Sequence, residues 1–440
     1  MRLTAAHFLA LAAVAPSVFA ETAAPAPAES PAPAEAPVPS ISPAPWPRWR
    51  GPNDDGAAGP CPAPVAWDAT TNVRWKAPLP GPGCSTPIVW DRRIVLTAAA
   101  DGKDAVLAFD PDGRPLWQTT LGPERKGKHR NGSGSNPSAA TDGRRVFAYF
   151  KSGALAALDG NGRVLWATNV QERFGPDTLY WDVGTSPVLT GKDVVVSMIR
   201  RGESWLAAFA QEDGALRWRA TQRFVTPDEG DHSYATPLVV RQEGREALLV
   251  LGGERLTAHD AADGSVLWFC GALNPATKAN WVPVASPVVA GGIAVVPYGR
   301  GGTLHGIRLG GSGDVTATHR AWVREDTGSF VPTPAAAGGR VYLLRDRGGL
   351  QCIDPATGVT VWGGELPKSS ASFFASPLVA DGKVYCARED GVVFVARAEG
   401  PLEVLAENRL GERLIASPVP LAPGRLLLRG EKHLWCVGAE

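Results

Sequence analysis

The chain has 440 residues, and its 44 lysines and arginines equal its 44 aspartates and glutamates. This balance argues against a nucleic-acid partner held by net charge. The length suits two ordinary domains or one large all-β domain, and composition does not decide between them.

Residues 1–20 have the form of a secretory signal. Arg2 precedes an apolar run from Leu3 to Phe19, and the small residues at its end predict cleavage after Ala20. We therefore expect a periplasmic or secreted protein. We expect no lipid anchor, because the residue directly after the cut is Glu21 and not cysteine. Residues 21–45, almost all Ala, Pro, Glu and Ser, are expected to be a linker that buries too little apolar surface to fold. No later segment has the length of a membrane-spanning helix.

A Ser/Thr-Pro or similar step followed by apolar residues recurs along residues 46–440. Proline disfavours helix in the residue before it and is tolerated at the first position of a strand, so each step predicts the start of a short strand. The first four intervals between the prolines are 50 residues each, and the others are 47, 43 and 41. The eight steps are Thr86-Pro87, Asn136-Pro137, Ser186-Pro187, Thr236-Pro237, Ser286-Pro287, Thr333-Pro334, Ser376-Pro377 and Ser417-Pro418.

A second pattern lies between consecutive prolines, where glycine precedes tryptophan by four residues, as in Gly113 and Trp117. This spacing predicts a tight turn followed by a strand that buries an indole. With two further β runs, each period holds four strands, which is typical of a propeller blade. We therefore predict an all-β, eight-bladed β-propeller with four antiparallel strands per blade. The last unit lacks its fourth strand, and an N-terminal strand at Asn72–Trp75 is expected to complete it and close the ring.

The run from Asp354 to Trp362 resembles the tryptophan-docking repeat of the pyrroloquinoline-quinone (PQQ)-like propeller family. The run from Trp46 to Asn53 is similar to the start of many secreted PQQ-like repeat proteins. That family includes quinoprotein dehydrogenases, which hold PQQ and calcium, and non-enzymatic, BamB-like propellers of outer-membrane-protein assembly. The resemblance covers residues 46–440 as a single domain and implies the fold, whereas one fold hosts many functions.

In such a blade, the loop before the first strand and the loop after the second strand open on the same face. We expect this face to bind a ligand, because its loops carry aromatic, histidine and arginine side chains. The loops before the first strands supply His129, Arg130, Asn131, Trp181, His232, Tyr234, Trp281, Phe330 and Phe374. The loops after the second strands supply Arg200, Arg300, Arg345, Arg388 and Arg429 at regular distances from their prolines.

These five arginines have two interpretations. Converging on one funnel with aromatic walls, they would suit a protein partner or an anionic or glycan ligand, since guanidinium pairs with carboxylate and stacks on rings. Alternatively, the carboxylates that lie near Arg345, Arg388 and Arg429 in the sequence would make them blade-to-blade salt bridges.

The histidines lie in different repeats without a paired-ligand spacing, so we predict no metal site. Six cysteines in an exported chain permit disulfides. Cys61 and Cys84 lie outside the repeated strands and are the expected pair. Cys352 and Cys436 occupy equivalent strands and are expected to stay reduced.

Two main classes of function remain. The first is an exported, monomeric, non-catalytic scaffold that binds a ligand or protein through the funnel. The second is a quinoprotein oxidoreductase with PQQ and calcium in the funnel, although the chain lacks the adjacent cysteine pair common in those dehydrogenases and the Cys-x-x-Cys-His motif of an attached haem. A sugar-acting lyase or hydrolase using His232 and Tyr234 is a third hypothesis. The sequence favours the scaffold, with neither catalytic residues nor a bound cofactor.

Overall fold

The computed structural model describes residues 45–438, which lie within the second of two units, Ile41–Glu440. The predicted signal, 1–20, and all but the last residue of the predicted linker, 21–45, lie outside the described residues. Within 45–438 there are two short helices, α1 (Val170–Phe174) and α2 (Thr316–His319), and the regular structure is otherwise β. In this range no helix is long and apolar enough to cross a membrane.

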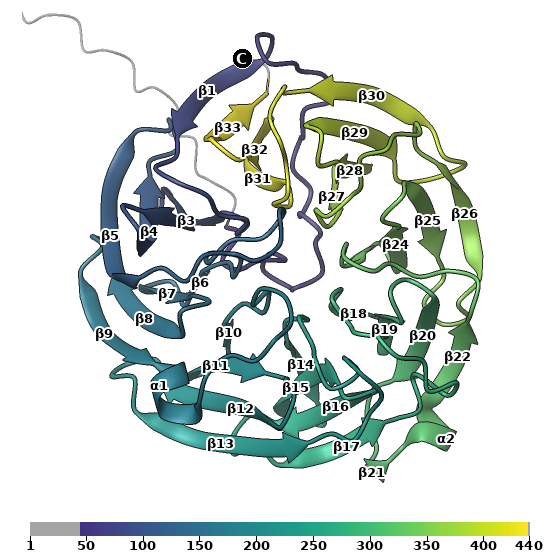
Figure 1. Cartoon of the computed structure of the whole chain (residues 1–440). Helices are drawn as coiled ribbons and strands as arrows, with labels where there is room; N and C mark the ends of the chain where they lie inside the picture. The colour runs from purple at the N-terminus through teal and green to yellow at the C-terminus, as the bar shows by residue number, and fades with distance from the viewer. Residues whose placement is uncertain (1–44, 439–440) are drawn as a thin grey trace, which may run out of the picture. The chain divides into compact units, whose positions relative to one another are not determined.

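The strands of residues 45–438 form eight sheets arranged as a ring, which confirms the predicted propeller (Figure 1). In blades 1–7 chain order runs from the channel outward. From the inner strand outward, blade 1 consists of β2 (Ile88–Trp90), β3 (Arg93–Ala100), β4 (Lys103–Phe109) and β5 (Pro115–Pro123), and blade 2 consists of β6 (Ala140–Thr141), β7 (Arg145–Tyr149), β8 (Ala154–Asp159) and β9 (Val164–Asn169). Blade 3 consists of β10 (Val188–Leu189), β11 (Asp193–Met198), β12 (Glu203–Ala210) and β13 (Leu216–Arg223), and blade 4 consists of β14 (Leu238–Gln242), β15 (Arg245–Gly252), β16 (Arg255–Asp260) and β17 (Val266–Cys270).

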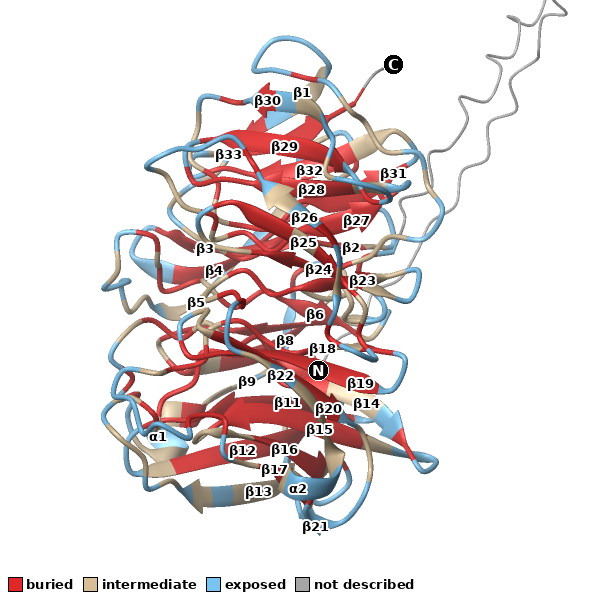
Figure 2. Ribbon diagram, turned by 90° about the vertical axis from the view of Figure 1, so that its right-hand side faces the viewer, coloured by how far each residue is buried: buried red, intermediate tan, exposed pale blue. Residues whose placement is uncertain are grey.

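The second half of the ring follows the same plan. Blade 5 consists of β18 (Val288–Ala290), β19 (Ile293–Tyr298), β20 (Thr303–Arg308) and β22 (Arg320–Arg324), and blade 6 consists of β23 (Ala335–Ala337), β24 (Arg340–Leu344), β25 (Gly349–Ile353) and β26 (Thr360–Glu365). Blade 7 consists of β27 (Leu378–Ala380), β28 (Lys383–Ala387), β29 (Val392–Arg397) and β30 (Val404–Arg409), and blade 8 consists of β31 (Val419–Ala422), β32 (Arg425–Arg429), β33 (His433–Val437) and β1 (Val73–Pro78). A short fifth strand, β21 (Gly313–Asp314), pairs in parallel with β17 at the outer edge of blade 4. The middle strands of the blades are buried along most of their length, and exposed residues concentrate in turns and outer strands (Figure 2).

The ring is closed by strands from opposite ends of the described chain, as predicted. β1 pairs antiparallel with β33, with Trp75 opposite Cys436. The indole of Trp75 then reaches into blade 1, where its Nε1 donates to the carbonyl of Pro111 at 2.9 Å. The N-terminal strand therefore joins blade 8 to blade 1 through both backbone and side chain.

The same tryptophan contact is repeated between other neighbouring blades. Trp117 donates to the Gly160 carbonyl at 3.0 Å, and its ring lies against Gly162 in the turn of the next blade. Gly162 has φ of +81°, and a Cβ there would lie 2.6 Å from the indole. The glycine of the Gly-x-x-x-Trp pattern is therefore required both by its backbone conformation and by the preceding blade's tryptophan. Trp268 is an exception, since its Nε1 donates to the Gln242 side chain of its own blade.

The hydroxyls of the Ser/Thr-Pro steps form a closed belt around the channel. The backbone N–H of each step donates to the side-chain oxygen of the step in the next blade, and the eighth bond, from Ser417 to Thr86, returns to the start at 3.2 Å. In blade 2 the belt residue is Ser138, two positions after the Asn136 identified from the sequence. The hydroxyl belt consists of Thr86, Ser138, Ser186, Thr236, Ser286, Thr333, Ser376 and Ser417.

Residues 46–68, here called the N-terminal plug, cross the channel from blade 1 and then run outward along blades 7 and 8 to β1 (Figure 1, purple). Trp46 forms a bridge with Val89 of blade 1. The buried Arg50 guanidinium donates to the carbonyls of Pro334 and Pro377, at 3.3 and 2.8 Å, in blades 6 and 7. Because these partners lie on different sides of the ring, the plug ties blades together as well as blocking the channel. Nothing in the repeat pattern predicts this arrangement.

Candidate functional site

A cavity of about 290 Å³, here called the mouth cavity, occupies the channel on the face formed by the loops before the first strands. Its floor includes Trp49 of the N-terminal plug. Its wall includes five hydroxyl-belt residues: Thr86, Ser138, Ser186, Ser376 and Ser417. Its rim includes seven of the predicted site residues: His129, Asn131, Trp181, Tyr234, Arg300, Phe330 and Phe374. The cavity thus combines an apolar floor, a polar wall and an aromatic rim.

The belt hydroxyls keep part of their hydrogen-bonding capacity for a ligand. Each of their oxygens already accepts a backbone N–H from the preceding blade, at 2.9 Å for Ser138 and 3.0 Å for Ser186. The O–H hydrogen and the second lone pair of each oxygen remain, so each hydroxyl can donate to an acceptor and accept one further hydrogen bond. The wall therefore offers hydrogen-bond donors and acceptors to a bound molecule.

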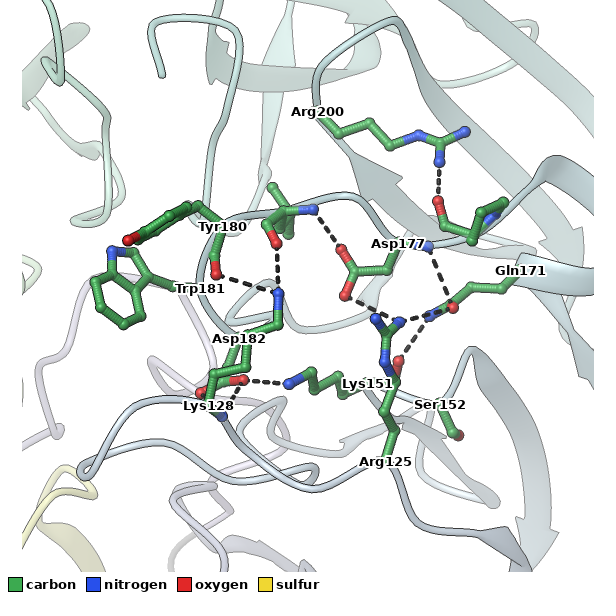
Figure 3. Close-up of polar contacts among 12 residues, drawn as sticks. Arg125, Lys128, Lys151, Ser152, Gln171, Asp177, Tyr180, Trp181, Asp182 and Arg200 are labelled. Carbon is green, nitrogen blue, oxygen red and sulfur yellow. Dashed lines mark hydrogen bonds and ion pairs between the residues drawn. The ribbon is translucent and has the colours of Figure 1, made fainter. Parts of the chain in front are cut away.

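The rim loop 176–183 is held in place by two buried carboxylates (Figure 3). Asp177 accepts the backbone N–H of Leu179 at 2.8 Å and contacts the Arg125 guanidinium at 3.4 Å. This loop presents Tyr180, which is exposed, and Trp181 beside it, with ring centroids 4.8 Å apart in an edge-on arrangement. Fixed carboxylates inside the loop therefore position the aromatic rings at the rim.

Asp182 is the second of these carboxylates and links blade 3 to blade 2. It pairs with the buried ammonium of Lys151. It also accepts the backbone N–H groups of Lys128 and His129, at 2.8 and 3.0 Å. All of its acceptor capacity near the cavity is used by these donors, so Asp182 acts as a structural anchor of the rim (Figure 3).

The rim side chains contact one another around the opening. The His129 ring lies edge-on to Trp181, with centroids 5.1 Å apart. The hydroxyl of Tyr234 accepts the backbone N–H of Trp181 at 2.9 Å, and burial raises the pKa of this phenol well above its usual value. Tyr234 is therefore neutral at physiological pH and holds Trp181 rather than acting as a base.

Arg300 carries the rim's exposed positive charge. Its guanidinium lies 4.8 Å from the Phe330 ring centroid, a cation–π distance. Within residues 45–438 no carboxylate lies within 4.0 Å of it. The residue is exposed, in a glycine-rich turn at φ +56°. It is thus available to a ligand.

The other predicted arginines do not reach the mouth cavity, so the expected ring of five converging guanidinium groups is wrong. Arg200 is buried and donates to the backbone carbonyls of Glu203 and Phe174, both at 3.1 Å. Arg388 is buried against Asp390 of its own blade at 2.9 Å. Arg429 donates to the Ser85 carbonyl at 2.8 Å, and Arg345 is half-buried outside the cavity lining. The position of these arginines after the second strands predicts the face on which they lie but not the direction of their side chains. Backbone carbonyls below the loops, which would otherwise be unpaired, attract the guanidinium groups.

Three further predicted residues also lie away from the cavity lining. His232 is 5% exposed, and burial lowers its pKa, so the imidazole is neutral. Arg130 turns to Glu389, 3.3 Å away. Trp281 packs against Gly299 under the ammonium of Lys278. The structure therefore does not bring His232 to Tyr234 as an acid–base pair in an open site.

Several residues of the site were not identified from the sequence. Trp49 lies in a motif that indicated only a family resemblance, and the pair Trp181-Asp182 indicated a loop of the binding face but not the anchoring role of Asp182. The hydroxyl belt has a sequence signal, the Ser/Thr before seven of the eight prolines, which in the sequence predicts strand starts but not a belt. A side chain recurring once per blade next to the channel was the available clue.

The predicted disulfide between Cys61 and Cys84 is wrong for this structure, since both are free. Cys61 lies in the plug, where its neighbours Pro62 and Ala63 contact Gly424 and Asp381 in the turns that end the first strands of blades 8 and 7. Cys84 lies at the opposite end of the first strands, where its thiol donates to the Asn131 carbonyl at 3.2 Å. The two cysteines thus lie on opposite faces of the propeller.

The mouth cavity does not fit a quinone–calcium centre. Among the described residues that line it, Asp182 is the single carboxylate, and Lys151 and two backbone N–H groups occupy it. No group of three or more His, Cys, Asp or Glu within 45–438 is placed to hold a metal ion. Calcium sites combine several oxygen ligands and usually include carboxylates, whereas the amide oxygens of Asn131 and Asn136 in this lining already accept from Arg413 and Ser133.

Comparison with known proteins identifies relatives of two kinds. A family model described as outer membrane protein assembly factor BamB matches residues 61–201, 181–321 and 312–400. A protein of that description from Yersinia pestis is 26% identical over 276 residues, which is 60% of this chain and 62% of the relative's length. The aligned part thus spans less than two thirds of that relative.

Solved structures share the fold at low sequence identity. BamB from Moraxella catarrhalis matches with a TM-score of 0.59 and 15% identity, over 82% of this chain and 98% of that one. A quinohemoprotein alcohol dehydrogenase from Comamonas testosteroni matches with a TM-score of 0.65 and 13% identity, over 90% of this chain and 80% of that one. At such identities the likeness establishes the fold alone.

Proposed function

The chain belongs to the family of PQQ-like repeat propellers described as outer membrane protein assembly factor BamB, and on that premise we propose that it is an exported scaffold that binds a protein partner through the mouth cavity. The family description supports a protein partner. The cavity supplies the place where a short segment of that partner would dock.

The observation that carries the proposal is Arg300, an exposed guanidinium without a carboxylate partner in the described residues, seated on Phe330 above the cavity. A cation beside aromatic rings favours an acidic side chain next to an apolar one. The partner segment would place a carboxylate against Arg300 and an aliphatic or aromatic side chain among Trp181 and Phe374. The same chemistry fits an acidic glycan, which the experiment below distinguishes.

We propose further that the scaffold works without PQQ and calcium. The engaged carboxylate of Asp182 and the lack of a metal-ligand cluster in residues 45–438 support this. An absorption titration with PQQ and calcium checks the point, and a saturable spectral change at one site per chain would contradict it.

Export is proposed from the signal-like residues 1–20. Intact mass and N-terminal sequencing of protein secreted by the native host should give a chain starting at Glu21. A chain that retains residues 1–20 would contradict export by this route.

The binding proposal can be tested with defined peptides. A fluorescent peptide alternating Glu with Leu should bind the purified protein, and the matching peptide with Gln in place of Glu should bind at least about tenfold more weakly. Arg300→Gln should cause a similar loss by removing the charge, and binding should weaken with added salt. Trp181→Ala should weaken both peptides.

Arg345→Gln is the matched control, because Arg345 occupies the corresponding loop of the next blade but does not line the cavity. It should bind as the parent does. Equal binding of the two peptides, or equal losses in the two arginine variants, would overturn the proposal. Binding of oligogalacturonate, with no binding of the acidic peptide, would replace the protein partner by a glycan.

A further inference from the structure

A second, smaller cavity of about 50 Å³ lies beside the mouth cavity, where blades 8, 1 and 2 meet. The two cavities share Cys84 and Asn131 in their linings. Arg429 from the end of β32, Arg413 from the loop before β31, and Gly83 from the loop before β2 also line the smaller one. At this size it has room for one or two species as large as water, and not for a peptide side chain or a sugar.

Arg429 brings a buried and only partly satisfied cation to this cavity. It is 2% exposed. Its Nη1 donates to the carbonyl and hydroxyl of Ser85, whereas its Nε and Nη2 have no hydrogen-bond partner among the described residues. Space for Nη2 exists only because residue 83 is glycine, since a Cβ there would lie 2.0 Å from that nitrogen.

No carboxylate in residues 45–438 forms an ion pair with Arg429. The nearby acids have other partners: Glu389 contacts Arg130 and the Asn131 side chain, and Glu412 contacts His433. Burial lowers the pKa of Arg429 to about 10, so the guanidinium is still charged at neutral pH. A buried charge without a counter-charge is costly, and proteins normally pair it.

Arg413 adds a second cation to the same wall. Its Nη2 donates to the Arg130 carbonyl and to the Asn131 side-chain oxygen, which fixes the guanidinium beside the cavity. Glu431 also lines the cavity but is exposed. Two guanidinium groups, one fully buried, thus face this small cavity without a buried carboxylate to balance them, and the neighbouring Cys84 thiol is neutral because burial raises its pKa.

We propose that this cavity is a binding site for one small monovalent anion of the size of chloride, held by Nε and Nη2 of Arg429 with Arg413 alongside. The anion supplies the missing counter-charge and joins blade 8 to the loops that precede blades 1 and 2. Since it binds only the closed ring, it stabilises closure by mass action. This site does not depend on the proposed partner binding.

Bromide, which replaces chloride and scatters anomalously, gives the direct test. Crystals of the parent protein grown in sodium bromide should show one anomalous peak within hydrogen-bonding distance of Arg429 Nε and Nη2. Water-level density without an anomalous signal at that position would overturn the proposal. This result needs no variant, so it decides the question even if substitutions at Arg429 prevent folding.

Stability in solution gives a second test. At constant ionic strength, replacing sodium gluconate by sodium chloride should raise the Tm of the parent by on the order of 2 °C and then saturate, because gluconate is too large for the cavity. Arg429→Met should abolish that rise. Arg388→Met is the matched control, since Arg388 is equally buried at the equivalent position of blade 7 but pairs with Asp390, and it should keep the chloride effect. An equal chloride effect in both variants would overturn the proposal.

Discussion

Substituting Gly113 by alanine should open the seam at which the ring is closed. Gly113 lies in the turn before β5, with φ of +80°, and a Cβ built on it would lie 2.5 Å from the indole of Trp75. Trp75 belongs to β1, the strand that completes blade 8. Alanine would therefore push away the side chain that fastens blade 8 to blade 1. Gly102, in the turn between β3 and β4, is the matched control: its φ is +71°, and no heavy atom lies within 4 Å of its Cβ position.

The two substitutions share one cost and differ in two others. Both place an alanine in the left-handed region, which costs roughly 1–2 kcal/mol. Gly113→Ala adds overpacking, at about 1–3 kcal/mol. It also strains the hydrogen bond from Trp75 Nε1 to the Pro111 carbonyl, whose net contribution is about 1 kcal/mol. We expect Gly113→Ala to lower the free energy of unfolding by about 2–4 kcal/mol more than Gly102→Ala does.

Urea unfolding followed by circular dichroism measures both losses, and hydrogen exchange locates them. In Gly113→Ala the amides of β1 and β33 should exchange faster than in the parent, because the seam opens without unfolding the other blades. In Gly102→Ala they should exchange as in the parent. Equal destabilisation of the two variants, with β1 and β33 still protected, would refute the role assigned to Trp75.

Three other predictions concern the rim, the plug and the N-terminal strand. Asp182→Asn should lower the free energy of unfolding by about 3–5 kcal/mol, because it leaves the buried Lys151 unpaired. Asp228→Asn, which breaks the exposed pair with Arg201, should lower it by less than about 1 kcal/mol, and urea unfolding measures both. Burial raises the pKa of Asp54 to about 6, so the folded state favours the protonated carboxyl. As pH rises from about 4 to 6, the free energy of unfolding of the parent should therefore fall by up to ~3 kcal/mol relative to that of Asp54→Asn. A difference between the two proteins that stays constant with pH would contradict this. Deleting residues 46–78 should lower the Tm by at least about 5 °C, since it removes the plug and β1 together, and a smaller change by calorimetry would show that closure does not depend on them.

Much of the fold could be predicted because its signals repeat. Each proline marks a strand start through local backbone restriction, and each Gly-x-x-x-Trp pattern marks a turn and a docking indole, so eight weak signals support one another. The missing fourth strand of blade 8 was predictable by counting, and β1 supplies it. Blade 2 shows the limit of the pattern, since Ser138 and not Asn136 takes the belt position.

The site was predictable only in part, because side-chain direction depends on unpaired groups that the sequence does not reveal. Arg200 and Arg300 both lie 13 residues after their prolines, yet Arg300 is exposed at the rim and Arg200 is buried against the Glu203 and Phe174 carbonyls. The plug has no repeat period, so neither its path nor Trp49 at the cavity floor could be derived. The same path separates Cys61 from Cys84.

The hydroxyl belt determines the width of the central channel. Its bonds all run in one direction around the channel, and the last of them, from Ser417 to Thr86, forms only when the preceding blades are in place. A copy with one blade duplicated or deleted would change the circumference and leave a donor and an acceptor facing each other at the wrong distance. The belt therefore fixes the diameter of the channel independently of the rim loops, which precede the first strands. Insertions or exchanges in those loops can change what the rim recognises, while the diameter available to a guest stays the same.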